Sequence, residues 1–223
     1  MKKIMFNDKY GLTGAVLDGR KTMTRRIIKT PKTMEGRDVY GAASVRKPGS
    51  NEIIEVFATD EDGAQINNIL PNYRVGEIVA VAQNLKDMGY NPRDTKHRSG
   101  EIWGLDHCTA WMNKMFVRAS ECKHHIRITG IRIERILDIS DDDCIKEGIQ
   151  AVRIPDGWRY VAGGSKICES DCNRIWSGEL KLSEKCAFNS PYAAFANLFD
   201  RVSGKGSWDK NPLVYVYSFE LVK

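Results

Sequence analysis

The sequence has no long hydrophobic run. Its 223 residues are 42% hydrophobic and 28% charged, a composition typical of soluble globular proteins, and no apolar stretch approaches the ~20 residues that a membrane-spanning helix needs. Only three apolar residues stand between Lys3 and Asn7, whereas the apolar region of a secretory signal takes about 7 to 15 residues. We therefore expect a soluble, cytoplasmic protein with no membrane partner.

The sequence also lacks the closely spaced cysteine pairs that usually hold a structural zinc ion. Its one nearby pair, Cys168 and Cys172, has three residues between its members. Zinc binding is an alternative, because further soft ligands are available at Cys108, Cys122, Cys186, His107, His124 and His125. The spacing is loose and cytoplasmic cysteines are usually thiols, so we expect no metal and no cofactor.

No phosphate-cradling glycine motif follows a strand pattern, and neither an internal repeat nor a low-complexity segment is present. Strands and long helices do not alternate as a doubly wound parallel sheet requires. These absences disfavour that fold class.

Positive charge, in contrast, is abundant at one end of the chain. Residues 1–47 hold twelve Lys or Arg against four Asp or Glu, although the net charge of the whole chain is only +5. The densest part is GRKTMTRR, residues 19–26, with four cations and two threonines. Such a surplus can attract phosphate-bearing partners. It can equally be a solvated basic face that only keeps the protein in solution.

Three short helices are predicted from capping signals and apolar spacing. They are expected over residues 12–16 before Gly19, over residues 141–147 between Ser140 and Gly148, and from Ser190-Pro191 to Gly204. The buried face of the third should consist of Ala194, Phe195, Leu198, Phe199 and Val202.

Strands are predicted from alternating or β-branched runs. They are expected over residues 22–28, 52–59, 77–82, 126–134 and 213–222. In the fourth, the alternation changes phase at Thr129-Gly130, as a β-bulge would cause. Residues 83–122 and 149–189 have no sustained period and are interpreted as two irregular insertions. The patterns predict an α+β fold, a single domain over residues 1–223 built on a curled mixed sheet or small β-barrel with short peripheral helices.

Four blocks of the sequence carry a family resemblance. In chain order they are LDGRKTMTRR, YRVGEIVAV, IRITGIRIERILDISDDDCIKEGI and FANLFDRVSGKGSWDKNPLVYVYSFELV. They resemble the ASCH domain of the PUA-like superfamily, and are most similar to ASCH proteins of phages and prophages. The resemblance implies a PUA-like β-barrel with a cleft that receives RNA or a modified nucleoside.

One branch of this family hydrolyses N4-acylated cytidines through a lysine, a threonine and a glutamate, and carries the pattern G-R-K-T-x-T-x-R. Residues 19–26 match that pattern. The resemblance places the three reactive groups on Lys21, Thr24 and Glu147. Two functions are therefore expected as alternatives: a protein that binds RNA or a modified nucleoside, and an amidohydrolase that deacylates a cytidine-like substrate.

The remaining ligand-binding candidates are polar or aromatic residues near the matched blocks. In the N-terminal pattern they are Arg20, Thr22 and Arg26. A fourth, Trp208, follows a glycine-rich stretch and could stack on a base. The alternative is that Trp208 fills the core while the glycines turn the chain.

The chemistry of these residue types is consistent with amide hydrolysis. A threonine hydroxyl is a weak nucleophile until a neighbouring base takes its proton, and lysine can be that base only when it is neutral. Nearby arginines and burial in a cleft both lower the pKa of Lys21, whereas an ion pair with Glu147 raises it. Glu147 is therefore assigned to orienting Lys21 or to passing protons to the leaving amine.

The triad also makes a demand on the backbone. Lys21 and Thr24 are three residues apart, so in an extended strand their side chains would point to opposite faces. The site therefore requires a turn near Gly19 to Thr22. The alternative is that Lys21 and Arg26 only hold phosphate, and that Thr22 and Thr24 only favour a strand. Glu147 would then be a helix-end carboxylate paired with Lys146 or Arg135.

Overall fold

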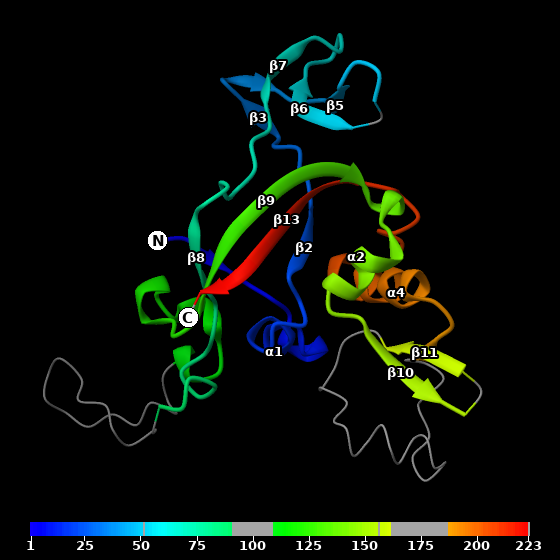
Figure 1. Cartoon of the computed structure of the whole chain (residues 1–223). Helices are drawn as coiled ribbons and strands as arrows, with labels where there is room; N and C mark the ends of the chain where they lie inside the picture. Colours follow the sequence, from blue (N-terminus) through cyan, green and yellow to red (C-terminus); the bar gives the residue numbers. More distant parts are fainter. Residues whose placement is uncertain (51, 91–108, 156, 162–186, 223) are drawn as a thin grey trace, which may run out of the picture.

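The computed structural model describes residues 1–50, 52–90, 109–155, 157–161 and 187–222. Within these residues the protein is a mixed α+β fold, mostly sheet, with three short helices (Figure 1). The helices are α1 (Leu12–Leu17), α2 (Asp141–Lys146) and α4 (Pro191–Ser203). No helix among the described residues combines the length and the apolar character needed to cross a membrane.

The main sheet has the strand order β1-β8-β9-β13-β2. These strands are β1 (Lys3–Ile4), β8 (Ile78–Val81), β9 (His125–Arg135), β13 (Leu213–Val222) and β2 (Met23–Ile27). β1 runs parallel to β8, and the other neighbours are antiparallel. β9 and β13 curve together across the molecule (Figure 1). In the strand pairing of the described residues the path is open between β1 and β2, so it does not close into a barrel.

The predicted bulge in the long strand is confirmed. Gly130 pairs with Ser218 and Ile128 pairs with Phe219, so Thr129 is an extra residue on β9. A bulge bends its strand and increases the local twist. The curvature of the β9–β13 pair in Figure 1 is consistent with this bulge.

A second group of strands forms an arm beyond one end of the β9–β13 pair (Figure 1). It contains β3 (Thr33–Met34), β4 (Arg37–Asp38), β5 (Gly41–Arg46), β6 (Ile53–Thr59) and β7 (Gln65–Asn68). β6 joins the arm to the main sheet by pairing Ile53 with Ile133. Only β6 was predicted from the sequence. It buries three apolar residues, Ile53, Val56 and Ala58, whereas β7 buries one and β5 none.

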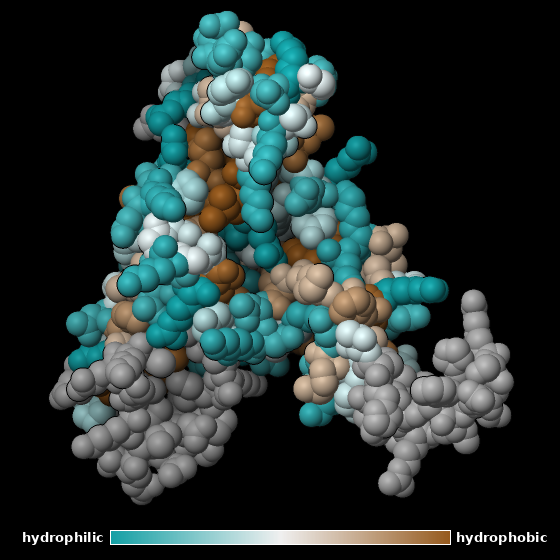
Figure 2. All heavy atoms as spheres, turned by 180° about the vertical axis from the view of Figure 1, so that it is seen from behind, coloured by the Kyte–Doolittle hydropathy of each residue, from teal (hydrophilic) through white to brown (hydrophobic). Residues whose placement is uncertain are grey.

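Part of the apolar surface of the arm remains open to solvent. Hydrophobic side chains show through its hydrophilic surface in the view from behind (Figure 2). The exposed fraction is 50% for Ile54 on β6 and 75% for Leu70 after β7. A small sheet cannot bury both of its faces without a covering layer.

The hydrophobic core lies where the helices meet the main sheet. One buried cluster combines Leu12 and Val16 of α1, Phe195 and Leu198 of α4, and the central strands. Val214 to Tyr217 on β13 are all buried, so this strand is covered on both faces. Full burial of each large apolar side chain is worth roughly 1.5–3 kcal/mol, so this cluster holds the helices against the sheet.

The predicted helix boundaries are confirmed by their caps. The backbone at Gly19 has φ +72°, Ser140 Oγ accepts a hydrogen bond from Asp143 N at 3.2 Å, and Ser190 Oγ accepts one from Ala193 N at 3.1 Å. The predicted buried face of α4 is wrong at Val202, which is 42% exposed. Val202 lies in the last turn of α4 and borders a pocket, so no sheet residue covers it.

The two segments interpreted as irregular differ in outcome. The described parts of 83–122 contain only the single-turn 3-10 helices Thr109–Trp111, Lys114–Phe116 and Ala119–Glu121, as expected. In contrast, 149–189 contains an antiparallel hairpin of β10 (Gln150–Ile154) and β11 (Gly157–Val161), with β12 (Ala187–Phe188) beside it. Val152 is the only fully buried residue of these three strands, so the alternation that reveals a strand is absent. Residues 91–108 and 162–186 lie outside the described part.

Candidate functional site

Lys21 lies outside strand β2, at the end of a turn that follows helix α1. Gly19 N donates to Val16 O at 3.0 Å, and Lys21 N donates to Ala15 O at 2.9 Å. The positive φ of Gly19 is a conformation that glycine adopts without the penalty of a side chain. Because β2 begins at Met23, Lys21 and Thr24 are not held to opposite faces of one strand. The required turn is therefore present.

Glu147 reaches the same place from the end of α2. Its backbone N donates to Asp143 O at 2.9 Å, and Gly148, with φ +102°, turns the chain directly afterwards. In addition, Thr22 N donates to Lys146 O at 2.9 Å. This backbone bond fixes the end of α2 against the start of β2.

Lys21 and Glu147 form a buried ion pair. Lys21 Nζ donates to Glu147 Oε2 and, at 2.8 Å, to the backbone oxygen of Glu147. The two residues are 2% and 3% exposed. Charges this far from water are retained only when they are paired and hydrogen-bonded.

Burial lowers the pKa of Lys21 below its ordinary value. Loss of water around the ammonium is the largest cause, and the neighbouring Arg26 and Arg25 lower the pKa further. The Glu147 carboxylate opposes them through its charge and its hydrogen bond. The net direction is downward, which increases the share of neutral lysine at a given pH.

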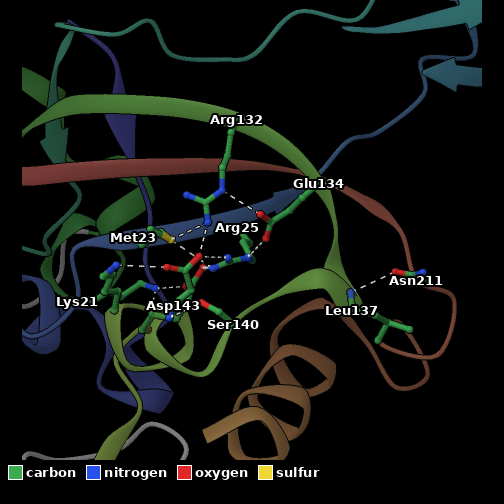
Figure 3. Close-up of polar contacts among 11 residues, drawn as sticks. Lys21, Met23, Arg25, Arg132, Glu134, Leu137, Ser140, Asp143 and Asn211 are labelled. Carbon is green, nitrogen blue, oxygen red and sulfur yellow. Dashed lines mark hydrogen bonds and ion pairs between the residues drawn. The ribbon is translucent and has the colours of Figure 1, made fainter. Parts of the chain in front are cut away.

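Arg25 links the pair to two further carboxylates (Figure 3). Its guanidinium donates to Glu134 Oε1 at 2.7 Å, to Asp143 Oδ2 at 2.8 Å and to Glu147 Oε1 at 3.2 Å. The Arg25 side chain is fully buried. Each oxygen of Glu147 thus accepts from a different cation, which fixes the carboxylate in the plane between Lys21 and Arg25. From the sequence, Arg25 was expected only to be one of the charges near Lys21, and the dense cations of residues 19–26 were the one signal for it.

Lys21, Arg25 and Glu147 line a pocket with a volume of about 490 Å³. This volume falls within the ~300–1,000 Å³ of small-molecule sites. Apolar side chains from the N-terminal segment and α4 form much of its wall, namely Phe6, Leu12, Phe195, Leu198 and Phe199. Its polar groups include Lys21, Thr24, Arg26 and Glu147. A wall of this kind suits a flat ring, and the polar groups suit a substituent on that ring.

Thr24 and Arg26 face the pocket from β2. They are two residues apart, so they share a face of the strand. Thr24 is 5% exposed, and its hydroxyl makes no side-chain hydrogen bond within the described part of the chain. Arg26 donates to Met5 O at 2.5 Å and lies over the Phe6 ring, 5.7 Å from its centroid. The Thr24 hydroxyl, which has no side-chain partner among the described residues, is therefore available to a ligand.

A second buried lysine, Lys114, was not predicted. It comes from the 3-10 segment Lys114–Phe116, which has no periodic pattern that would signal a buried position. Its ammonium donates to Phe6 O, to Thr13 Oγ1 at 3.2 Å and pairs with Asp8 Oδ2 at 2.8 Å. These contacts use its three donors. Lys114 thus holds the N-terminal wall of the pocket in place.

Three of the ligand-binding candidates do not line this pocket. Arg20 pairs with Asp18 at 3.3 Å. Thr22 contributes its backbone to the contact with α2. Trp208 packs edge-on against Tyr192, Phe195 and Phe199, while Asp200 accepts hydrogen bonds from the Trp208 and Gly206 backbone. The structure therefore gives Trp208 a packing role and does not bring it to the pocket.

The described residues contain no group of three or more His, Cys, Asp or Glu that could hold a metal ion. Cys122 and Cys144 are buried thiols, and burial raises the pKa of Cys144 to about 12. Of the other soft ligands considered for zinc, His124 and His125 are among the described residues. Cys108, Cys168, Cys172, Cys186 and His107 lie outside the described part.

The pocket combines the parts that acyl transfer needs. It holds a hydroxyl, a lysine whose proton affinity is reduced, and a carboxylate that orients the lysine. Comparison with protein-family models finds none that matches this chain, and comparison with curated proteins and with solved structures finds no match either. The ASCH resemblance is therefore a prediction that rests on the residues quoted for it.

Proposed function

We propose that this pocket binds a modified nucleoside and hydrolyses an amide on its base, as in N4-acylated cytidine. The observation that carries the proposal is the buried Lys21–Glu147 pair in one pocket with Thr24. A lysine that only attracts phosphate works best as a solvated cation. Lys21 is instead 2% exposed and bound to a carboxylate, and its pKa is lowered. A buried lysine with a lowered pKa is suited to proton transfer.

In the proposed reaction, neutral Lys21 accepts the proton of Thr24 as the Thr24 oxygen attacks the acyl carbon. The C–N bond of the tetrahedral intermediate then breaks, and Lys21 returns the proton to the leaving amine. Lys21 then accepts a proton from water as the water oxygen attacks the acyl-threonine ester. The bond between the acyl carbon and the Thr24 oxygen breaks, Lys21 returns the proton to that oxygen, and the carboxylic acid is released. Arg26 at the pocket edge donates to the developing oxyanion, and Glu147 holds Lys21 in place.

The proposed fold is the PUA-like fold of the ASCH family, here with a strand path that is open between β1 and β2 among the described residues. The curved β9–β13 pair, with β2 and β8 on its two sides, supports it. In this arrangement the pocket lies where the end of α2, the start of β2 and α4 meet.

The test is to incubate the purified protein with N4-acetylcytidine and to follow the release of cytidine and acetate. We expect turnover that falls by at least about a hundredfold in Lys21→Ala and Thr24→Val, since general-base assistance is worth ~10²–10⁴. Arg20→Ala is the matched control, because Arg20 belongs to the same sequence motif and lies outside the pocket. Unfolding curves would establish that each variant is folded.

RNA binding without turnover is the second candidate, favoured by the basic surplus of residues 1–47. Salt-sensitive binding of RNA by a protein that leaves N4-acetylcytidine intact would select it. Turnover that survives in both Lys21→Ala and Thr24→Val would exclude the proposed mechanism.

A further inference from the structure

A second cavity adjoins the pocket, and its chemistry differs from that of the pocket. This cavity, here called the flanking groove, has a volume of about 700 Å³. It shares five lining residues with the pocket, namely Met5, Arg25, Arg26, Val202 and Ser203. The two cavities therefore meet at Arg26 and the end of α4. A ligand held in the pocket therefore lies next to the groove.

The flanking groove is lined by cations and by no carboxylate. Its basic residues are Lys3, Arg25, Arg26 and Lys29, and neither Asp nor Glu is among its lining residues. The pocket, in contrast, contains Asp8 and Glu147. Cations that are not paired along such a concave surface produce a potential that attracts an anion.

Two of these four cations are already used inside the protein. Lys3 Nζ donates to the backbone oxygens of Lys114, Met115 and Val117, at 3.0, 3.0 and 2.6 Å. Arg25 donates to its three carboxylates. Lys3 therefore has no donor to spare, and the charge of Arg25 is balanced by the three carboxylates.

The other two cations have free donors, since Arg26 has five N–H groups and needs only one of them for the oxyanion of the proposed reaction. Within the described part of the chain, the Arg26 side chain makes one hydrogen bond, to Met5 O, and forms no ion pair. Lys29 is exposed and, within the same residues, its ammonium has no hydrogen bond or ion pair. An arginine with free N–H groups beside a free lysine is a combination that binds phosphate, the arginine through its fork and the lysine as a point charge.

The floor of the groove contributes no competing acid. It includes the rings of Tyr73, Tyr215 and Tyr217. Tyr73 Oη donates to Lys3 O at 3.2 Å, Tyr215 Oη donates to Ile69 O, and Tyr217 Oη accepts from Asn72 N at 3.1 Å. Burial raises the pKa of Tyr215 to about 12, so this phenol stays neutral beneath a bound anion.

We propose that the flanking groove is a phosphate subsite, in which Arg26 and Lys29 bind a phosphate group carried by the nucleoside that occupies the pocket. The inference rests on the proposed function, because phosphate is the anion that nucleosides carry next to the base and sugar. It makes the ligand a nucleotide unit instead of a free nucleoside. The same phosphate chemistry is present in a mononucleotide and in a polynucleotide strand.

The test compares four probes: N4-acetylcytidine, its 5′-monophosphate, its 3′-monophosphate and a short oligoribonucleotide with one central N4-acetylcytidine. We expect kcat/KM for at least one phosphorylated probe to exceed that for the nucleoside by about tenfold, as one charge-assisted contact supplies. Dissociation constants measured by calorimetry at 50 and 200 mM salt provide a readout that does not need turnover. A monophosphate that matches the oligonucleotide identifies a free nucleotide as the source, and a preference for the oligonucleotide identifies a strand.

The variants Lys29→Ala and Lys32→Ala form a matched pair. Both lysines are exposed, and only Lys29 lines the groove. We expect Lys29→Ala to reduce the preference for phosphorylated probes to about twofold or less and to weaken its salt dependence. Lys32→Ala should leave the preference unchanged.

The outcomes separate this inference from the proposed function. Equal handling of the nucleoside and all phosphorylated probes, unaffected by Lys29→Ala, overturns the phosphate subsite and leaves the proposed function standing. Equal loss of preference in Lys29→Ala and Lys32→Ala also overturns it, since the effect is then one of general charge. Absence of both binding and turnover for every probe overturns the proposed function and the subsite with it.

Discussion

Lys21 and Glu147 stand 126 positions apart in the chain and meet as a buried ion pair. The carboxylate is shared, because its second oxygen accepts from Arg25 at 3.2 Å. Loss of Lys21 therefore leaves Glu147 with one cation, whereas loss of Glu147 leaves two cations facing each other. Glu147 therefore contacts two cations of the site, whereas Lys21 contacts only one carboxylate among the described residues.

We expect Lys21→Met to lower the free energy of unfolding by about 3 kcal/mol. Breaking a buried pair typically costs ~3–5 kcal/mol, and the retained contact of Glu147 with Arg25 places this case at the lower end. Urea denaturation is the measurement. The matched control is Lys2→Met, because Lys2 forms a similar pair with Glu77 at 3.2 Å in which the lysine side chain is 52% exposed. That pair should be worth less than about 1 kcal/mol, and equal losses in both variants would contradict the buried assignment.

The lowered pKa of Lys21 predicts how stability depends on pH. In the unfolded chain Lys21 regains its ordinary value of 10.5, while in the folded chain its pKa lies below that. Between the two values the unfolded state binds more protons than the folded state, so the contribution of Lys21 to the free energy of unfolding rises with pH. The contribution is constant below the folded pKa and again above 10.5.

This dependence can be measured as the difference in unfolding free energy between the wild type and Lys21→Met at a series of pH values from 7 to about 10. We expect the unfolding free energy of the wild type to increase relative to that of the variant as the pH rises through this window. A relative decrease would mean that Glu147 outweighs burial and raises the pKa of Lys21. Glu147→Gln should enlarge the increase in unfolding free energy with pH, because it removes the carboxylate that opposes the lowering of the Lys21 pKa.

Local signals explain which parts of the fold were predictable from the sequence. Signals that depend on only a few neighbouring residues are confirmed. They are the helix caps at Gly19, Ser140 and Ser190 and the change of phase at Thr129. β5 and the β10–β11 hairpin were missed because they bury almost no side chains on either face. Without a buried face, an alternating pattern has no physical cause.

The candidate site was predictable only in part. Lys21, Thr24 and Glu147 were expected together from the family resemblance, and the structure places all three around one pocket. The contacts of Arg25 with three carboxylates were not predicted, because these carboxylates lie 109 to 122 positions away in the sequence. Lys114 was missed for a related reason, since its partners Asp8 and Phe6 belong to the N-terminal segment, and Phe6 is 108 positions away.

We expect Arg25→Lys to destabilise the protein although it keeps the charge. A single ammonium cannot reproduce the planar fork that reaches Glu134, Asp143 and Glu147 at once. At least one buried carboxylate is then left without its cation, at a cost of roughly 3 kcal/mol or more. Urea denaturation measures it. Arg132→Lys is the control, because Arg132 also contacts Glu134 and Asp143 but its side chain is 42% exposed, and it should change stability by less than about 1 kcal/mol.

The last test concerns the turn that places Glu147 beside Lys21. Gly148 has φ +102°, where a side chain is strained, although an added Cβ would meet only ordinary contacts, 3.5 Å from Lys21 Cβ and 3.6 Å from Ala15 Cβ. We expect Gly148→Ala to cost roughly 1–2 kcal/mol through backbone strain. Gly14→Ala is the opposite case, because Gly14 lies within α1, is exposed, and an added Cβ would meet nothing within 4 Å.

That second variant should stabilise the protein by about 0.5–1 kcal/mol, since alanine loses less conformational freedom in a helix than glycine. Thermal and urea unfolding of both variants would measure the two shifts. Because Gly148 directly follows Glu147, the strain should also disturb the ion pair, and Gly148→Ala should reduce turnover of N4-acetylcytidine while Gly14→Ala does not. A Gly148→Ala protein that is as stable as the wild type would show that the backbone here can adopt another conformation, and Glu147 would then not be held against Lys21 by this turn.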